Sequence, residues 1–496
     1  MAVLLGIDSG LTNTRAVLFD ETGNPLGASA AQSPQVTLSP GLVERDMEAL
    51  WETCVRAVRG AISKSGIRGK DISAVGVSGH GDGLYLVDHK HAPVRAAILS
   101  LDSRSSSILE GWRAQGLQEA LLRTTGRSPR PGSPAPLFAW LQHHEPESVG
   151  RTRWILNCKD WIRLRLTGEI WTDPTEANSF CGDIATGEYR VDLLEMLGLE
   201  QAGRKLPPIK GSIEIAGRVT REAAEATGLD PGTPVVGGLV DALASMLGTG
   251  CTHPGRLCMV SGTWGINGTL TTEPVAKEGL VCRRFATPGY WALMSNSPSS
   301  AANLGWFVEE FYPVSSGKDP DTSRFKLADY EASRLLGEGP EIVFLPFING
   351  SSGNSWKAAA FLGLRSWHTR GHMVKALMEG VAFDHKHQAS RLGSRFDNVL
   401  LSGGGTRSQT LSQIFADALW NTVTVSPVAE TGAWGAAICA AVGAGVCKSL
   451  CEIADRSLRG SRSYEPDPSR AEQMSQAYEA YLEILRLPLP PTLKEG

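Results

Sequence analysis

The fold is decided by residues 3–14, VLLGIDSGLTNT, a short apolar run that ends in small polar residues. Residues 16–19 (AVLF) are apolar again and lead into the turn-forming residues 22–25 (TGNP). This order predicts a strand, a loop lined by Ser, Thr and Gly, and a returning strand. Residues 257–270, LCMVSGTWGINGTL, repeat the same order about 250 residues later. The sequence therefore predicts the same hairpin twice.

Each hairpin offers backbone N–H groups and hydroxyls to a bound anion. We interpret the pair as two domains of similar architecture, with two unrelated hairpins as the alternative. The length of 496 residues, at roughly 150 per domain, allows about three domains or two large ones. The repeat favours two, residues 1–248 and 249–496, with a last helix at about 468–487 that is able to pack back on the first domain.

Composition excludes several function classes. Apolar residues make up 42% and charged residues 20% of the chain, which is typical of a folded protein with a large core. The formal net charge is −4, without the basic excess of nucleic-acid binders, so neither a nucleic acid nor a membrane surface is an expected partner. Nine cysteines without a Cys-x-x-Cys pair predict neither a disulfide framework nor a zinc site.

No secretory signal is visible in the first residues, and the most apolar stretch, residues 433–446, is too short to cross a bilayer core of about 30 Å. We therefore expect a cytoplasmic protein.

Strands and helices alternate between the two hairpins, and three strands are expected to end in chemically useful residues. Residues 72–77 form an apolar strand that runs into 78–83, SGHGDG. The apolar run 234–240 ends at Asp241, and an acid at the carboxyl end of a strand is well placed for chemistry. Residues 399–401 lead into SGGG and then a helix start, which is suited to phosphate or ribose.

Common nucleotide-binding motifs are absent. Neither Gly-Lys pair is followed by Ser or Thr, so there is no Walker A loop, and residues 403–408 lack the third glycine of a Rossmann fingerprint. Phosphoryl transfer without a P-loop fits what remains, because it needs a base for the acceptor hydroxyl, donors for the phosphates and Mg²⁺. Asp241, Thr12, Thr263 and Asp8 supply these residue types.

Residues 359–364 read AAFLGL, and after seven further residues 372–379 read HMVKALME. These two runs match the C-terminal signature of the FGGY carbohydrate kinases, which the chain resembles nearly end to end. The resemblance implies an α/β, two-domain actin/hexokinase-like (ribonuclease H-like) ATPase fold with the active-site cleft between the domains. It also implies ATP and Mg²⁺ as cofactors and a small sugar or polyol as substrate.

The resemblance implies roles for individual residues. Asp241 falls on the catalytic base, and Asp8, with Asp241 through water, on the metal site. The nucleotide-binding positions are Gly10, Thr12, Asn13, Arg15, Gly262, Thr263, Gly404, Gly405, Ser408 and Gln409. The substrate-binding positions are His80, Gly81, Asp82, Asp102, Arg104, Asp160 and Asp241.

The substrate side departs from the family pattern at two positions. Asp82 replaces a histidine that xylulose kinases carry, and Leu137 stands where a lysine is usual. Residues 262–264 and 297–304 look most like L-xylulose kinases, whereas 81–83 also occur in erythritol kinases. The substrate is therefore expected to be a ketopentose such as L-xylulose or xylulose, with erythritol or another polyol as the alternative.

We expect Asp241 to take the proton from a terminal hydroxyl as that hydroxyl attacks the γ-phosphorus of ATP. Alternatives from other classes are a non-catalytic sugar-binding or regulatory protein on the same fold, and a chaperone- or actin-like ATPase. The motifs Asp8, Thr12, Thr263 and Asp241 disfavour the first, and the polar loops at 80–82 and 102–104 disfavour the second. A homodimer is the assembly that we allow for.

Overall fold

The computed structural model describes residues 2–313, 320–339, 341–351 and 358–487. Contacts divide the chain into two units. The first contains Met1–His253, Leu270–Leu293 and Glu430–Ser457, and the second contains Pro254–Thr269, Met294–Ala429 and Leu458–Gly496. The chain thus returns to the first unit at residues 430–457. The predicted division at residue 248 did not include this return.

The first unit contains the following elements: β1 (Val3–Ser9), β2 (Asn13–Phe19), β3 (Pro25–Gln32), β4 (Val36–Ser39), β5 (Leu42–Arg45), α1 (Met47–Ser65), β6 (Ile72–Gly79), β7 (Tyr85–Val87), β8 (Ala97–Ile98), α2 (Ser106–Ala114), α3 (Gln118–Thr125), α4 (Pro134–His144), α5 (Pro146–Arg151), β9 (Trp154–Leu156), α6 (Cys158–Thr167), α7 (Pro174–Ala177), α8 (Val191–Met196), α9 (Glu200–Gly203), β10 (Ile215–Arg218), α10 (Arg221–Thr227), β11 (Pro234–Val236), β12 (Leu239–Val240), α11 (Asp241–Thr249), β15 (Val281–Arg284), α16 (Thr431–Gly443) and α17 (Leu450–Ser457).

The main sheet of the first unit has the strand order β10-β11-β6-β1-β2-β3, and β12 also pairs with β6. The hairpin of β1 and β2 is antiparallel, as the sequence predicts, while β6 runs parallel to β1, β11 and β12. Parallel strands need crossover connections, and the segment with α1 between β3 and β6 provides one.

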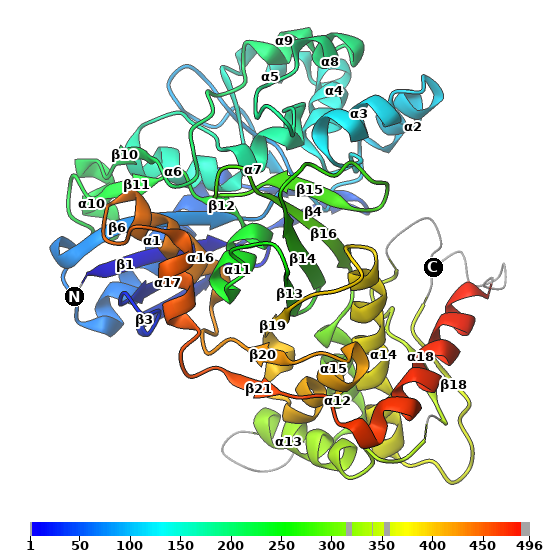
Figure 1. Ribbon diagram of the computed structural model, residues 1–496. Coiled ribbons are helices and arrows are strands. Elements are labelled where there is room, and N and C mark those ends of the chain that lie inside the picture. The colour runs from blue at the N-terminus through cyan, green and yellow to red at the C-terminus, as the bar shows by residue number, and fades with distance from the viewer. Residues whose placement is uncertain (1, 314–319, 340, 352–357, 488–496) are drawn as a thin grey trace. The chain divides into compact units, whose positions relative to one another are not determined.

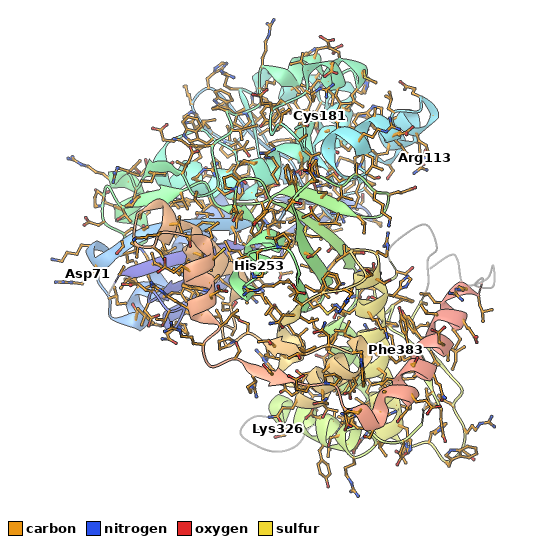
Figure 2. All side chains as sticks on the ribbon, in the orientation of Figure 1. Asp71, Arg113, Cys181, His253, Lys326 and Phe383 are labelled. Atoms are coloured by element: carbon orange, nitrogen blue, oxygen red, sulfur yellow. The ribbon has the colours of Figure 1, made fainter. Side chains whose placement is uncertain are left out.

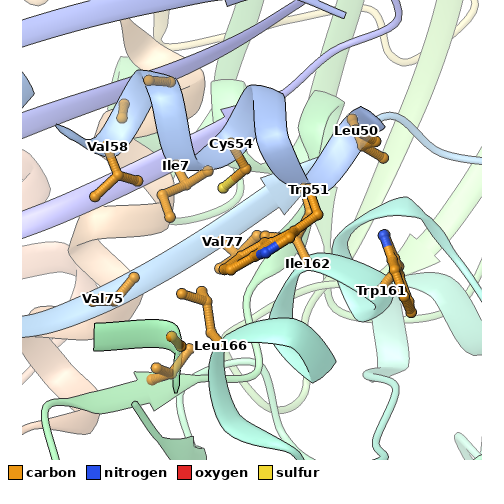
Figure 3. Close-up of a cluster of buried hydrophobic side chains, with 14 of the residues drawn as sticks. Ile7, Leu50, Trp51, Cys54, Val58, Val75, Val77, Trp161, Ile162 and Leu166 are labelled. Atoms are coloured by element: carbon orange, nitrogen blue, oxygen red, sulfur yellow. The ribbon is translucent and has the colours of Figure 1, made fainter. Parts of the chain in front are cut away.

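Helices cover both faces of this sheet (Figure 1). On one face, Ile7 and Val77 pack with α1 and α6 in a continuous apolar core (Figure 3). Side chains alternate along a strand, so Gly6 and Gly76 point to the other face, where α16 lies. A Cβ on Gly6 would come within 1.9 Å of the Ala433 carbonyl oxygen, so the close approach of α16 requires glycine there.

The second unit contains the following elements, with β14 and β16 assigned by most of their length: β13 (Arg256–Ser261), β14 (Gly265–Thr271), β16 (Trp291–Ser297), α12 (Ala301–Phe311), α13 (Pro320–Ser333), β17 (Val343–Leu345), β18 (Ala360–Leu362), α14 (Arg370–Ser390), β19 (Asn398–Ser402), α15 (Gln409–Leu419), β20 (Val423–Val425), β21 (Arg462–Tyr464) and α18 (Ala471–Arg486).

The sheet of the second unit repeats the topology of the first, with the order β16-β14-β13-β19-β20-β21. Its β13–β14 hairpin is antiparallel, β19 runs parallel to β13 and β20, and β21 closes the edge antiparallel. The hairpin repeat in the sequence therefore reflects two sheets with the same order and direction of central strands.

The last helix, α18, contributes to the core of the second unit. Met474, Ala477 and Tyr481 are buried there, and the Tyr481 ring lies 5.9 Å from that of Phe383 on α14. Phe383 is labelled in Figure 2. The segment that joins the first unit is instead α16 with α17. The apolar stretch 433–446, which the sequence shows to be too short for a bilayer, is largely this buried helix α16.

Within the described residues, no helix combines the length and the apolar character needed to span a membrane. The nine cysteines all lie in the described part of the chain, and no disulfide joins any of them.

Candidate active site

Three parallel strands of the first unit end side by side. In the register, Asp8 lies opposite Ser78, Ser9 opposite Gly79, and Val240 also opposite Gly79. The residues at or just beyond these strand ends are Asp8, His80 and Asp241. Because carboxyl ends of parallel strands meet at one edge of a sheet, the fold gathers these three side chains.

Asp241 is the first residue of α11, and its Oδ1 accepts a hydrogen bond from the backbone N–H of Ala242 at 2.7 Å. Burial, together with the nearby Asp8 carboxylate, raises the pKa of Asp241 to about 6. A carboxyl with a pKa close to the operating pH can exchange a proton efficiently, which is what a general base requires.

Asp8 occupies the end of β1, where its Oδ1 accepts a hydrogen bond from the Ser78 hydroxyl at 2.8 Å. Burial raises its pKa above the usual range. A Cβ on Gly432 would lie 2.4 Å from Asp8 Oδ2, so the first turn of α16 comes close to this carboxylate. The positive end of the α16 dipole favours negative charge at this point.

His80 is buried close to the carboxyl groups of Asp241 and Asp82. Its Nε2 lies 3.0 Å from the Tyr85 hydroxyl and its Nδ1 lies 3.4 Å from the Gly81 carbonyl oxygen. Burial and the charge of Arg45 lower the pKa of His80 to about 4. His80 is therefore a neutral, fixed imidazole at physiological pH.

Asp82 lies in the same loop with a positive φ of 64° and is buried. Its Oδ2 accepts hydrogen bonds from Nη2 of Arg127 at 2.7 Å and from Nη2 of Arg130 at 3.0 Å. Despite the cost of burial, these arginines hold the pKa of Asp82 well below its usual range. The sequence-predicted loop 80–82 is thus brought next to Asp241, because a Cβ on Gly81 would lie 2.7 Å from the Val240 side chain.

Asp102 and Arg104 form an ion pair of their own. Asp102 Oδ2 accepts from the backbone N–H of Val43 at 2.7 Å, and Arg104 reaches both Asp102 oxygens at 2.8–2.9 Å. Arg104 also pairs with Glu44 at 2.8 Å. These contacts tie the pair to β5, so a substrate contact by either residue stays a prediction.

Asp160 is buried in the first turn of α6, where both of its oxygens accept hydrogen bonds from the protein. Oδ1 receives Lys159 at 3.0 Å and Arg163 at 2.9 Å, and Oδ2 receives the Thr172 hydroxyl at 2.9 Å. Its carboxylate also closes a capping box with Asn157. These contacts support the fold of α6, and a role in substrate binding stays a prediction.

The loop of the first hairpin contains the remaining predicted nucleotide positions of this unit. The backbone N–H of Gly10 donates to the Asn13 carbonyl oxygen at 2.9 Å, which closes the turn. The Thr12 side chain is exposed, with its hydroxyl 3.3 Å from Asn13 Nδ2. Arg15 pairs with Glu430 at 3.4 Å.

The loop of the second hairpin is built from hydroxyls and glycine. Gly262 donates its N–H to the Trp264 carbonyl oxygen at 3.2 Å, and the Thr263 side chain is exposed. Behind the loop, the Ser261 hydroxyl lies 3.1 Å from that of Ser300. The two hairpin loops differ in length, because residues 10–13 join the first pair of strands and residues 262–264 join the second.

Residues 403–409 follow β19, the neighbour of β13. Gly403 has a φ of 93°, and a Cβ there would lie 2.6 Å from the Ser261 carbonyl oxygen, so this position requires glycine. A Cβ on Gly404 would meet nothing within 4 Å, whereas one on Gly405 would press on Ser261. Ser408 caps α15 by accepting from the Leu411 N–H at 2.9 Å, and Gln409 is exposed.

Mg²⁺ prefers carboxylate oxygens, water and substrate phosphates. No three His, Cys, Asp or Glu side chains gather into a metal-ligand set within the described ranges. Asp8 and Asp241 nevertheless offer two carboxylates at one edge of the sheet. This donor set fits an ion that is held mainly by nucleotide phosphates and water rather than by a cage of side chains.

Sequence reasoning missed two buried arginines at this site. Arg283 on β15 comes within 4.0 Å of Asp82 Oδ1 and 3.7 Å of the buried carboxylate of Glu176. Arg127 is the main partner of Asp82. One signal existed for Arg283, because β15 ends in two adjacent arginines, Arg283 and Arg284. Successive side chains of a strand point to opposite faces, so one of the two arginines is expected on the buried face, where a charged residue is usually paired.

Comparisons with known proteins agree on the family. The chain matches the N-terminal domain of the FGGY family of carbohydrate kinases over residues 3–248 and the C-terminal domain over 257–444. L-xylulose/3-keto-L-gulonate kinase of Escherichia coli is 33% identical over 97% of this chain and 96% of its own length. Erythritol kinase of Brucella abortus is 30% identical over 99% of this chain and 96% of its own.

A solved structure shares the fold: xylulose kinase from Rhodospirillum rubrum, with a TM-score of 0.85 at 26% identity over 97% of this chain and 98% of that one. The two repeated sheets, the carboxylates at the strand ends and both domain matches lead to one conclusion. This chain belongs to the FGGY family of carbohydrate kinases and has the two-domain α/β fold of that family.

Proposed function

We propose that the enzyme transfers the γ-phosphoryl group of ATP to a terminal hydroxyl of a small neutral sugar, a ketopentose of the xylulose type. The observation that carries this proposal is the part-buried Asp241 at the end of β12, with its pKa raised to about 6 beside Asp8. The identity to L-xylulose kinases over nearly the whole chain supports the substrate class.

In this proposal Asp241 accepts the proton of the acceptor hydroxyl as the hydroxyl attacks phosphorus. The raised pKa makes its carboxylate basic enough for the task and still ionised at neutral pH. His80 and Asp82 contact the sugar, and Gly10, Thr12, Gly262, Thr263 and Gly404 contact the nucleotide. Asp8 and Asp241 would hold Mg²⁺, which would compensate the charge of the phosphates when it is bound.

A polyol such as erythritol is a second candidate substrate. The loop Gly81-Asp82-Gly83 lacks the histidine of xylulose kinases, and Asp82 offers a carboxylate to a hydroxyl instead. Identity of 30% to an erythritol kinase supports this candidate. We further propose that the enzyme works in the cytoplasm, where ATP is supplied.

The test is ADP release by the full chain with Mg²⁺ and ATP. The acceptors are L-xylulose, D-xylulose, D- and L-ribulose, erythritol, glycerol and 3-keto-L-gulonate, beside a reaction without sugar. We expect one ketopentose to raise ADP release well above the sugar-free rate and to yield a phosphorylated product. Rates that stay at the sugar-free level with every acceptor would contradict the proposal, and preference for erythritol would select the second candidate.

A further inference from the structure

Only one of the two carboxylate oxygens of Asp82 accepts a hydrogen bond among the described residues. Its Oδ2 binds Arg127 and Arg130, while its Oδ1 is buried and has no hydrogen-bond partner in the described structure. A buried acceptor without a partner costs free energy, and such groups in native proteins commonly serve a ligand or water. Because the two arginines keep Asp82 ionised, a hydroxyl that donates to Oδ1 would make a strong, charge-assisted hydrogen bond.

Arg283 likewise uses only one end of its guanidinium for hydrogen bonds within the described residues. Every hydrogen bond that it makes among the described residues uses Nη1, which donates to the Thr175 carbonyl oxygen, to Asn178 Oδ1 at 3.0 Å and to Ser179 Oγ at 3.0 Å. These bonds fix the guanidinium, so Nη2 is held in place. Nη2 lies 4.0 Å from Asp82 Oδ1, which is too far for a direct hydrogen bond.

Arg283 Nη2 can donate a hydrogen bond and Asp82 Oδ1, 4.0 Å away, can accept one, so a ligand group that does both can bridge them. A hydroxyl both accepts and donates, so one oxygen can accept from Arg283 Nη2 and donate to Asp82 Oδ1. A carboxylate in the same place would accept from Arg283 but would be repelled by Asp82. The pair therefore selects a neutral, hydroxyl-bearing ligand.

This gap lies beside the proposed base. A Cβ on Gly81 would be 3.6 Å from Arg283 Nη2 and 2.7 Å from the side chain of Val240, the residue before Asp241. The backbone of Gly81 therefore packs closely against Val240 and lies near the guanidinium of Arg283. A sugar that reaches Asp241 with its terminal hydroxyl would place another of its hydroxyls near Asp82 and Arg283.

We propose that Asp82 Oδ1 and Arg283 Nη2 together bind one hydroxyl of the acceptor sugar, remote from the hydroxyl that is phosphorylated, and that this pair makes the enzyme select neutral sugars over sugar acids. The proposal rests on the proposed function. Arg127 and Arg130 act as positioning residues, since they orient and ionise Asp82.

The first experiment compares the wild-type enzyme with Arg283→Met, Arg283→Lys and the matched control Arg284→Met. Arg284 is the next residue on β15, and its guanidinium bonds backbone carbonyls and stacks near Trp291 instead. For the best neutral sugar we expect Arg283→Met to raise KM about 10- to 100-fold with KM for ATP unchanged, as for loss of a charged hydrogen bond. Arg283→Lys should recover part of the loss, and Arg284→Met should match wild type.

The second experiment uses monodeoxy analogues of that sugar. For the analogue that lacks the bound hydroxyl, wild type and Arg283→Met should have the same KM, whereas every other analogue should keep the difference. Asp82→Asn should also narrow the preference for the neutral sugar over 3-keto-L-gulonate. Thermal unfolding of each variant, compared with Arg284→Met, identifies a folding defect.

The outcomes separate the two proposals. If wild type phosphorylates no sugar, the proposed function fails and this inference falls with it. If wild type is active, two results would overturn this inference alone. Either Arg283→Met has the wild-type KM for the sugar, or its KM rises by the same factor for every deoxy analogue. In both cases Asp82 Oδ1 and Arg283 Nη2 bind water rather than a sugar hydroxyl. Should Arg283→Met fail to fold, Arg283→Lys and Asp82→Asn decide by the same analogue series.

Discussion

The two sheets have the same topology but end in different chemistry. Ser9 ends the first strand of one hairpin and Ser261 that of the other, so the residues before them, Asp8 and Val260, correspond. Asp8 lies opposite Arg15, whereas Val260 lies opposite Ile266. Next to the first hairpin, β6 and β12 lead to His80 and Asp241, whereas β19 beside the second leads to Gly403 and Gly404. Titratable groups thus gather at one set of strand ends and glycine at the other.

This difference predicts how the duplicated fold divides the proposed reaction. Proton transfer needs a group whose pKa is tuned by burial and neighbouring charge, and the first unit has one in Asp241. Binding a polyanion needs backbone N–H groups and hydroxyls that do not titrate, and the loops of the second unit consist of these. The fold is common to both units, and function depends on the residues at the strand ends.

The largest expected effect comes from removing the base. Asp241→Asn should lower kcat about 10²- to 10⁴-fold, because an amide cannot take the proton from the acceptor hydroxyl. Steady-state ADP release with the best sugar measures the effect. The matched control is Asp384→Asn in the second unit, because Asp384 is also a buried carboxyl whose pKa is raised to about 6 by burial. A kcat of Asp241→Asn within threefold of the wild-type value would exclude Asp241 as the base, and with it the difference in chemistry between the two units.

The next effect probes the glycines of the second unit. Gly404→Ala adds a methyl group that meets no protein atom within 4 Å, so the free energy of unfolding should not change. If the nucleotide approaches this backbone, the methyl group should raise KM for ATP about 5- to 100-fold, the equivalent of an overpacking cost of about 1–3 kcal/mol. Urea unfolding and ATP saturation curves measure the two quantities. An unchanged KM for ATP would remove Gly404 from the nucleotide site.

The pH dependence should belong to the first unit alone. The base works when it is deprotonated, so kcat/KM should fall about tenfold per pH unit below a pKa of about 6 and level off above it. Asp8 raises this pKa by repulsion, while the charge of Arg283 lowers it. Asp8→Asn should therefore move the acid limb to lower pH, whatever it does to the maximal rate.

A control for that profile comes from the second hairpin. Thr263→Val changes a neutral group and should leave the position of the acid limb where it is in wild type. A limb that does not move in Asp8→Asn, or that moves equally in Thr263→Val, would show that the titrating group lies outside the strand ends of the first unit.

Sequence reasoning reached the parts of this picture that depend on local pattern. The two hairpins, the strand before Asp241 and the loop 80–82 each follow from a run of apolar residues that ends in polar ones, so neighbouring strand ends could be predicted to meet. The C-terminal signature carried the family and hence the fold class. These features need only a few consecutive residues to be recognised.

The remaining features depend on long-range contacts that leave little local signal. Arg127 and Arg283 lie 45 and 201 residues after Asp82 in the chain, yet both contact it. The residues next to them in the sequence do not indicate Asp82 as the partner. The return of α16 to the first unit is similar, since its Ala- and Gly-rich sequence indicates close packing but not against which sheet. Asp160 stays a predicted substrate-binding residue, and the sequence alone did not indicate its buried hydrogen bonds with Lys159, Arg163 and Thr172.

The smallest expected effect concerns the charge that distinguishes the two hairpins. Arg15 pairs with Glu430 at 3.4 Å, and both side chains are more than 40% exposed, so Arg15→Met should change the free energy of unfolding by less than about 1 kcal/mol. Ile266→Met at the corresponding position of the second hairpin is the control. If Arg15 also binds a phosphate, KM for ATP should rise in Arg15→Met and the rise should weaken at high salt, because screening already reduces the wild-type contact. A salt-independent KM that equals the wild-type value would assign Arg15 to the ion pair with Glu430 alone.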